Sequence, residues 1–90
     1  MIDIAVITPY HREPKNYMVI CHDSVRNQQY PARHILVADG HPDPVVAHWG
    51  ADHIVLPYAH DDIGSTPRAI GALHAVGAGF GALAFLDADN

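Results

Sequence analysis

Short apolar runs alternate with mixed, amphipathic stretches along this chain. Four of the runs are rich in isoleucine, valine, leucine or alanine. Runs of this length, bounded by turn-forming residues, are typical of strands that are buried on both faces of a sheet. They predict strands over residues 2–8, 34–38, 52–56 and 82–86. We expect Pro9 to end the first strand and Asp39-Gly40 to end the second.

Two helices are predicted in the first half of the chain. Pro14 suits the first position of a helix, where its missing N–H costs nothing, and Tyr30-Pro31 stops that helix. The Pro-Asp-Pro sequence at 42–44 opens a shorter helix that runs to Trp49. The positions that share one face of the first helix, and that we expect to be buried, are Tyr17, Ile20, Cys21, Ser24 and Gln28, flanked by Val25.

The third predicted helix begins at Thr66-Pro67. A hydroxyl residue that caps the helix, followed by proline at the first helical position, is a strong start signal. Either Gly77 or Gly79 closes this helix. Its apolar positions, which we expect to face the sheet, are Ile70, Leu73 and Val76.

Strands and helices therefore alternate along the whole chain. This alternation predicts a parallel sheet with right-handed crossovers, so the fold class is α/β: a Rossmann-like parallel sheet with flanking helices. A sheet of this size with three helices leaves an edge uncovered, and we expect the chain to self-associate through that exposed edge. The residues expected to be largely buried in the core are Ile4, Val6, Ile35, Val37, Ile54, Leu83 and Phe85.

Composition narrows the classes of function. The chain has 90 residues, which suffices for one small domain, and a formal charge of −5 with five lysines and arginines. This balance argues against nucleic acid as a partner, because a phosphate backbone needs a basic surface. No apolar run approaches the ~18 residues of a transmembrane helix. The N-terminus lacks the basic stretch of a signal peptide, and the single Cys21 makes no internal disulfide, so we expect a cytoplasmic location.

The eight histidines of the chain do not form a recognisable metal motif. None of them has the HxH or HExxH spacing of zinc sites, and there is no cysteine pair to complete such a site. We therefore interpret them as surface or hydrogen-bonded histidines. The glycine-rich sequence at 77–81 follows a helix and precedes a strand, whereas a dinucleotide-binding loop has the opposite order, so it is interpreted as a turn.

Polar residues follow the predicted strands at their carboxyl ends, where open α/β sheets bind ligands. Thr8-Pro9-Tyr10, Asp39-Gly40 and Asp87-Ala88-Asp89 all belong to this rim. Two carboxylates spaced i, i+2 on an extended backbone point to one side and repel each other unless a cation intervenes. Oxygen ligands of this kind suit Mg²⁺ or Mn²⁺. The alternatives are an ordinary Asp-Gly turn and a solvated turn after the last strand.

Arg68 lies in the first turn of the third predicted helix. A cation is unfavourable there, because the helix dipole is positive at this end, but it becomes useful if an anion binds. The alternative is that the Arg68 side chain extends into solvent or forms an ion pair with Asp61 or Asp62.

These motifs, taken in order, resemble the N-terminal half of a family 2 glycosyltransferase with the GT-A fold. The segment AVITPYHRE is similar to the first strand of that family and its P-x-Y-N-x-E loop, and SVRNQQYP to its S-V-x-x-Q-x-Y-P helix end. The segments ILVADG, TPRAIGALHA and LAFLDADN resemble the V-V-D-D-G-S, R-N-x-G-x-x-x-A and F-L-D-x-D-D motifs. The chain departs from these patterns at Arg12, Ala38, Ala69 and Asn90.

The resemblance implies a glycosyltransferase that binds a nucleotide-diphosphate sugar with Mn²⁺ or Mg²⁺ and transfers the sugar, with inversion, to an unknown acceptor. Residues 1–90 would be the donor-binding part of an incomplete GT-A domain, and the general base and the acceptor site would lie beyond Asn90. The metal would be held by Asp87 and Asp89. The residues implied to bind the nucleotide sugar are Thr8, Pro9, Tyr10, Glu13, Asp39, Arg68 and Asp87.

Three other interpretations remain open from the sequence. The chain could bind a nucleotide without catalysing a reaction, since the family's general base is missing from it. A sugar-phosphate nucleotidyltransferase shares the architecture but needs a glycine-rich basic loop after the first strand, where this chain has Pro9-Tyr10-His11-Arg12. An α/β scaffold without a site would leave the acidic rim and Arg68 without a role.

Overall fold

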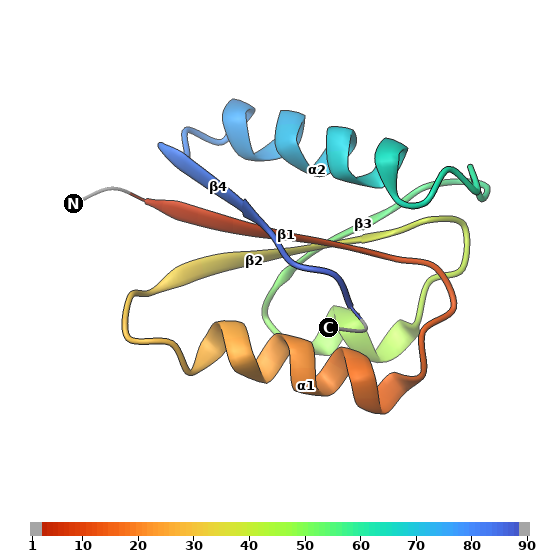
Figure 1. Cartoon of the computed structure of the whole chain (residues 1–90), viewed down its shortest axis with the longest axis horizontal. Helices are drawn as coiled ribbons and strands as arrows, with labels where there is room; N and C mark the ends of the chain where they lie inside the picture. Colours follow the sequence, from red (N-terminus) through yellow and green to blue (C-terminus); the bar gives the residue numbers. More distant parts are fainter. Residues whose placement is uncertain (1–2, 89–90) are drawn as a thin grey trace.

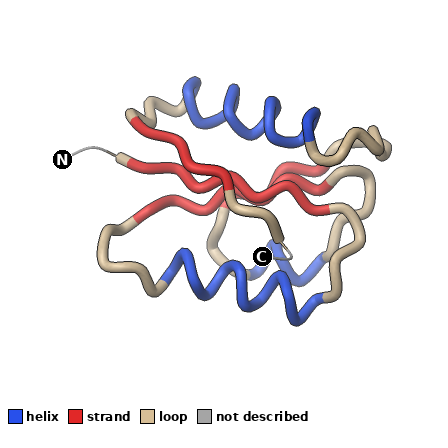
Figure 2. The backbone as a smooth tube through the Cα atoms, in the orientation of Figure 1, coloured by secondary structure: helices blue, strands red, loops and turns tan. Residues whose placement is uncertain are grey.

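A four-stranded parallel sheet forms the centre of the molecule, in strand order β3-β2-β1-β4. The structure is a computed structural model, and it describes residues 3–88. Helix α2 covers one face of the sheet, and α1 with the short helix η1 covers the other (Figures 1 and 2). The predicted alternation and parallel pairing are thus confirmed. The elements are β1 (Ile4–Tyr10), α1 (Lys15–Arg26), β2 (Ala32–Ala38), η1 (Pro44–His48), β3 (Asp52–Val55), α2 (Ser65–Gly77) and β4 (Ala82–Phe85).

Strand β1 continues through Pro9 to Tyr10, so the prediction that Pro9 ends it was wrong. The carbonyl of Ile7 accepts a hydrogen bond from Leu86 on the β4 side, and that of Tyr10 accepts one from Asp39 on the β2 side. Because successive residues alternate, the nitrogen of Pro9 faces the β4 side. Strand β4 has already ended at Phe85, so a residue without an N–H loses no ladder bond there.

Helix α1 buries a different face from the one predicted. Cys21 and Val25 are buried as expected, whereas Tyr17 and Ile20 are 47% and 62% exposed. The buried face is completed by Met18 and His22. The polar residue His22 lies at the centre of this face and interrupts its apolar periodicity. The sequence pattern therefore indicated a face centred on a neighbouring row of residues. His22 is buried because its ring finds a partner on β2, which periodicity does not reveal.

Helix α2 also turns a different side to the sheet. Leu73 and Val76 are 69% and 64% exposed, so their predicted burial was wrong; Ile70 packs against the core. The buried positions are the small residues Pro67, Gly71 and Ala75. A Cβ atom on Gly71 would lie 2.6 Å from Cγ2 of Ile7. The small residues let α2 approach β1 closely. The core on this side is therefore filled by strand side chains that pack directly against the helix backbone, and not by large helix side chains.

The predicted core is confirmed at the two inner strands and wrong at β4. Val6, Ile35 and Val37 are buried, Ile4 and Ile54 are partly buried, and Leu83 and Phe85 are 36% and 53% exposed. The cause is strand order. Leu83 and Phe85 point to the α2 face beside Ala5 and Ile7, but β4 lies at the edge of the sheet, where α2 covers it poorly. Within residues 3–88, no helix is long and apolar enough to cross a membrane.

Candidate functional site

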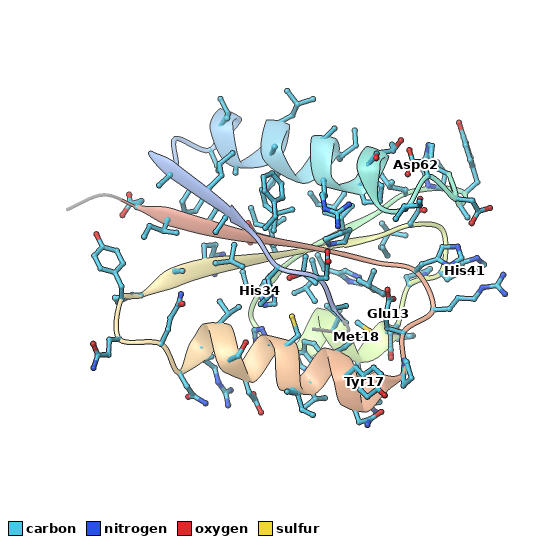
Figure 3. The ribbon with its side chains drawn as sticks, viewed as in Figure 1. Glu13, Tyr17, Met18, His34, His41 and Asp62 are labelled. Atoms are coloured by element: carbon cyan, nitrogen blue, oxygen red, sulfur yellow. The ribbon has the colours of Figure 1, made fainter. Side chains whose placement is uncertain are left out.

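A cleft of about 370 Å³ opens at the carboxyl ends of the strands. Six of the seven predicted nucleotide-sugar residues line it: Pro9, Tyr10, Glu13, Asp39, Arg68 and Asp87. The other lining residues, which the sequence analysis did not select, are His11, Asp61, Ile63, Gly64, Pro67 and Ala88. Glu13, His41 and Asp62 mark this end of the molecule in Figure 3. The cleft thus combines the loop after β1, the end of β2, the loop before α2, the start of α2 and the segment after β4.

Asp39 lies buried at the base of the cleft, where it holds the loop that precedes α2. Its Oδ1 accepts hydrogen bonds from the backbone N–H and from Nδ1 of His60, each at 3.0 Å. Its Oδ2 accepts a bond from the Asp61 backbone N–H at 3.4 Å. Burial alone would raise the pKa of the Asp39 carboxyl, but the bonds from His60 and Asp61 lower it below its ordinary value. Asp39 is therefore ionised, with most of its acceptor capacity already used.

Gly40 lets the same loop pack directly on the end of β2. Its φ is +84°, in the left-handed region that favours glycine, and a Cβ atom there would lie 2.3 Å from the backbone nitrogen of Ala59. The Asp-Gly pair is a turn, as its composition suggests. In this fold the turn also supports the loop before α2, which forms one wall of the cleft.

The loop before α2 carries unusual backbone geometry beside the cleft. Asp61 and Ile63 have φ values of 52° and 59°, a region that L-residues seldom adopt and that is especially unfavourable for a β-branched side chain. Arg68 Nη1 donates a hydrogen bond to the Ile63 carbonyl at 2.8 Å. Strained backbone persists only where its surroundings hold it. Here the surroundings are Arg68 on one side and Asp39 on the other.

The N-terminus of α2 does not offer the free N–H groups that anion binding usually exploits. The Ser65 N–H donates to the Asp62 carbonyl at 3.2 Å, the Thr66 N–H donates to the Asp62 carboxylate at 3.0 Å, and the Arg68 N–H donates to the Gly64 carbonyl at 3.0 Å. The helix begins one residue before the predicted cap, with Gly64 rather than Thr66 as its N-cap. An anion at this end would therefore have to be bound by the Arg68 side chain.

Arg68 forms an ion pair with Asp87 across the cleft. Its Nη2 lies 2.5 Å from Asp87 Oδ1, and the two side chains are 32% and 55% exposed. The predicted alternative was a pair with Asp61 or Asp62. Asp61 instead lies 3.0 Å from His11 Nε2, and Asp62 caps α2. The two groups expected to act on a ligand, one as a cation and one as an acid, thus neutralise each other.

Only part of the predicted metal site can be placed. Asp89 lies outside the described residues. Asp87 uses Oδ1 for Arg68, and among residues 3–88 no side chain is bonded to its Oδ2. Within that part of the chain, no three histidine, cysteine, aspartate or glutamate side chains converge as metal ligands. Mg²⁺ often takes only one or two protein carboxylates and completes its shell with phosphate and water. Asp87 fits a metal of that kind.

The loop after β1 closes the remaining wall. Glu13 Oε2 accepts a hydrogen bond from the His11 backbone N–H at 2.6 Å, which fixes the turn after the strand. Tyr10 lines the cleft but is almost fully buried. Its hydroxyl meets His53 Nε2 at 2.5 Å and accepts a bond from the Asp43 N–H at 3.1 Å. Burial raises the pKa of this hydroxyl. The Tyr10 side chain therefore supports the wall rather than facing a ligand.

Thr8 is the predicted site residue that does not line the cleft. Its side chain points to the α1 face, where Oγ1 lies 3.7 Å from Cys21 Sγ, and joins a buried polar chain that includes His34, which is labelled in Figure 3. Thr8 Oγ1 lies 2.7 Å from His34 Nε2, and His34 Nδ1 lies 2.8 Å from His22 Nδ1. Burial, with His22 adjacent, lowers the pKa of His34 to about 4, and burial together with Arg26 lowers that of His22. Both rings are therefore neutral at pH 7.

The comparisons with known proteins assign no family. The sequence matches no protein-family model, and no curated protein shows significant similarity to it. Evidence on function therefore comes from the motifs and from the cleft itself. The cleft brings together one cation, four carboxylates and a histidine, in the residues Arg68, Glu13, Asp39, Asp61, Asp87 and His11. This set can bind an anionic ligand through Arg68 and a cation through Asp87.

Proposed function

We propose that the cleft binds a nucleotide-diphosphate sugar together with Mn²⁺ or Mg²⁺, and that the chain is the donor-binding part of a GT-A glycosyltransferase of the family 2 type. The observation that carries this proposal is the convergence of six residues, separated by up to 78 positions in the sequence from Pro9 to Asp87, on one cleft at the carboxyl ends of parallel strands. Ligands of open α/β sheets bind at that edge.

Each wall of the cleft has a part in this proposal. The loop from Pro9 to Glu13 and Asp39 form the nucleoside side, where Asp39 keeps one oxygen that is only weakly engaged, by the Asp61 N–H at 3.4 Å. Arg68 faces the diphosphate as a bidentate cation. Asp87 holds the metal, which neutralises charge on the leaving nucleotide when bound.

Binding measurements test the proposal. Calorimetry with uridine, guanosine and adenosine diphosphates, each with and without MnCl₂, should show metal-dependent binding of at least one of them. Arg68→Gln should weaken binding about tenfold or more, because it removes charge-assisted hydrogen bonds to phosphate. Arg26→Gln is the matched control, since Arg26 lies at the C-terminal end of α1, pairs with Asp23 and does not line the cleft. Equal losses in the two variants, or no binding of any nucleotide, would contradict the proposal.

A nucleotide-binding role without catalysis is the second candidate, and one observation favours it. Among residues 3–88, each of the four cleft carboxylates has at least one oxygen beside a partner: Glu13 at the His11 N–H, Asp39 at His60, Asp61 at His11 Nε2 and Asp87 at Arg68. A general base needs a free acceptor oxygen within reach of the substrate hydroxyl, and these contacts reduce the number of carboxylate oxygens available for that role. Both candidates predict no acceptor-dependent sugar transfer by this chain. Calorimetry with a nucleotide sugar and with its nucleoside diphosphate separates them, since only the donor-binding role requires the sugar-bearing ligand to bind.

A further inference from the structure

The Arg68–Asp87 ion pair occupies both of the groups that the proposed ligand requires. Arg68 Nη2 and Asp87 Oδ1 are 2.5 Å apart, and both residues line the cleft. Arg68 also donates from Nη1 to the Ile63 carbonyl at 2.8 Å. That second bond anchors the guanidinium beside the cleft, so Arg68 can release Asp87 without leaving its place.

We propose that this ion pair is exchanged when ligand binds, so that Asp87 passes from Arg68 to a divalent metal while Arg68 passes from Asp87 to a phosphate. The inference rests on the proposed function. The pair then acts as a coupling device, because it makes the binding of metal and the binding of nucleoside diphosphate depend on each other.

The coupling follows from the charges. A metal that binds Asp87 alone competes with the Arg68 cation for the same carboxylate and is repelled by the positive charge beside it. A diphosphate that approaches Arg68 alone leaves the Asp87 carboxylate facing its negative charge. When both bind, the charges alternate along the line from Arg68 through phosphate and metal to Asp87, and the pair is broken only once. By linkage, each ligand must then raise the affinity for the other by the same factor.

The size of the effect is set by the exposure of the pair. Half-exposed ion pairs of this kind are weak, and breaking one changes an equilibrium about two- to fivefold. The Arg68–Asp87 pair therefore does not block the cleft. It reduces the affinity for metal alone and for nucleotide alone while leaving the ternary complex accessible.

The test measures four affinities in four forms of the chain: unchanged, Arg68→Gln, Asp87→Asn and Arg12→Gln. The affinities are those for MnCl₂ alone, followed by the electron paramagnetic resonance of free Mn²⁺, for a nucleoside diphosphate alone, and for each in the presence of the other. Arg12 is exposed, bonds His41 at 3.1 Å and does not line the cleft, so Arg12→Gln removes one positive charge at the same end of the molecule without touching Asp87.

Arg68→Gln should raise the affinity for Mn²⁺ alone about two- to fivefold, and Asp87→Asn should raise the affinity for nucleotide alone by a similar factor. Both should reduce the factor by which metal and nucleotide strengthen each other, and Arg12→Gln should change none of these values by as much. Metal-dependent nucleotide binding with unchanged coupling in the two variants would overturn the exchange alone. Absence of nucleotide binding in every form would overturn the proposed function and the exchange together.

Discussion

On the face covered by α2, the buried side chains of the strands are apolar, whereas on the face covered by α1 they include Thr8 and His34. The α2 side is a cluster of Ala5, Ile7, Ile35, Val37, Leu56 and Ala75. On the α1 side, Met18, Leu36 and Val46 pack beside the chain of hydrogen bonds that joins Thr8, His34 and His22. The same strands supply both faces, because alternate residues point to opposite sides.

The two faces differ in how they depend on conditions. Apolar packing on the α2 side is insensitive to pH and depends on shape. The polar chain on the α1 side requires neutral rings, since a protonated His34 would leave a charge in the core. The stacking of His22 on Trp49, with ring centroids 5.0 Å apart, adds apolar contact to the same histidine. One sheet therefore carries one face that tolerates acid and another that does not.

Ile7→Ala should produce the largest effect, because it opens a cavity at the centre of the α2 face. Ile7 is fully buried, and truncation of such a side chain costs about 4 kcal/mol of the free energy of unfolding. Leu83→Ala, on the same face but at the sheet edge, should cost about 1 kcal/mol or less. Urea denaturation followed by circular dichroism measures both. Similar losses at the two positions would show that burial does not distinguish the centre of this face from its edge.

Acidification should destabilise the folded chain, and the effect should come from the buried histidines of the α1 face. The pKa of His34 is about 4 in the folded chain against an ordinary value of 6.5. Between these pH values the unfolded chain binds a proton at His34 that the folded chain does not. The free energy of unfolding therefore has its full value above about pH 6.5 and falls as the pH approaches 4. The expected loss is about 3 kcal/mol. The Asp39 carboxyl has a lowered pKa, so its contribution is lost only at lower pH.

The variant His34→Gln isolates this effect, since glutamine can still bond Thr8 but does not titrate. Its free energy of unfolding should vary less between pH 6.5 and 4 than that of the unchanged chain. His48→Gln, at the end of η1, is the control and should keep the full pH dependence. If the two variants respond equally to acid, the sensitivity does not come from the buried pair.

The smallest effect is expected from Gly71→Ala, which tests the close approach on the α2 face. A methyl group would lie 2.6 Å from Ile7 Cγ2 and 3.2 Å from Val37 Cγ2. Overpacking of this kind costs about 1–3 kcal/mol, and the better helix propensity of alanine offsets about 1 kcal/mol of that. We expect a net loss of about 1 kcal/mol in urea denaturation. Gly77→Ala, where the added atom meets nothing within 4 Å, should not destabilise the chain.

Much of the fold was predictable because it depends on local patterns. The runs that became β2 and β3, and the alternation that sets parallel pairing, are visible in the sequence. The helix faces were not, because His22 is buried through a bond to His34, twelve residues away, and Gly71 is buried through proximity to Ile7. The exposure of Leu83 and Phe85 depends on strand order, which no local pattern encodes.

The candidate site was predictable in its location and less so in its contacts. The ends of parallel strands meet at one edge of a sheet, so Asp39 and Asp87 could be selected from the sequence, and Arg68 could be selected as a cation in the first turn of a helix. The partners of these residues depend on the loop from Ala59 to Gly64, whose path follows from the backbone of Gly40 and from the Asp39 bonds. His60 and Asp61 had no signal in the sequence beyond their polarity.

The close packing of Gly40 on Ala59 has a mechanical consequence. The backbones of these two segments pack without an intervening side chain, and the Asp39 bonds to His60 and Asp61 join the end of β2 to the loop before α2. Displacing that loop would break the Asp39 bonds and the contact of Gly40 with Ala59. The compliant wall of the cleft is therefore the opposite one, where the loop after β1 is held by Glu13 and by the contact of His11 with Asp61. A ligand too large for the resting cleft would be accommodated by movement of residues 11–13.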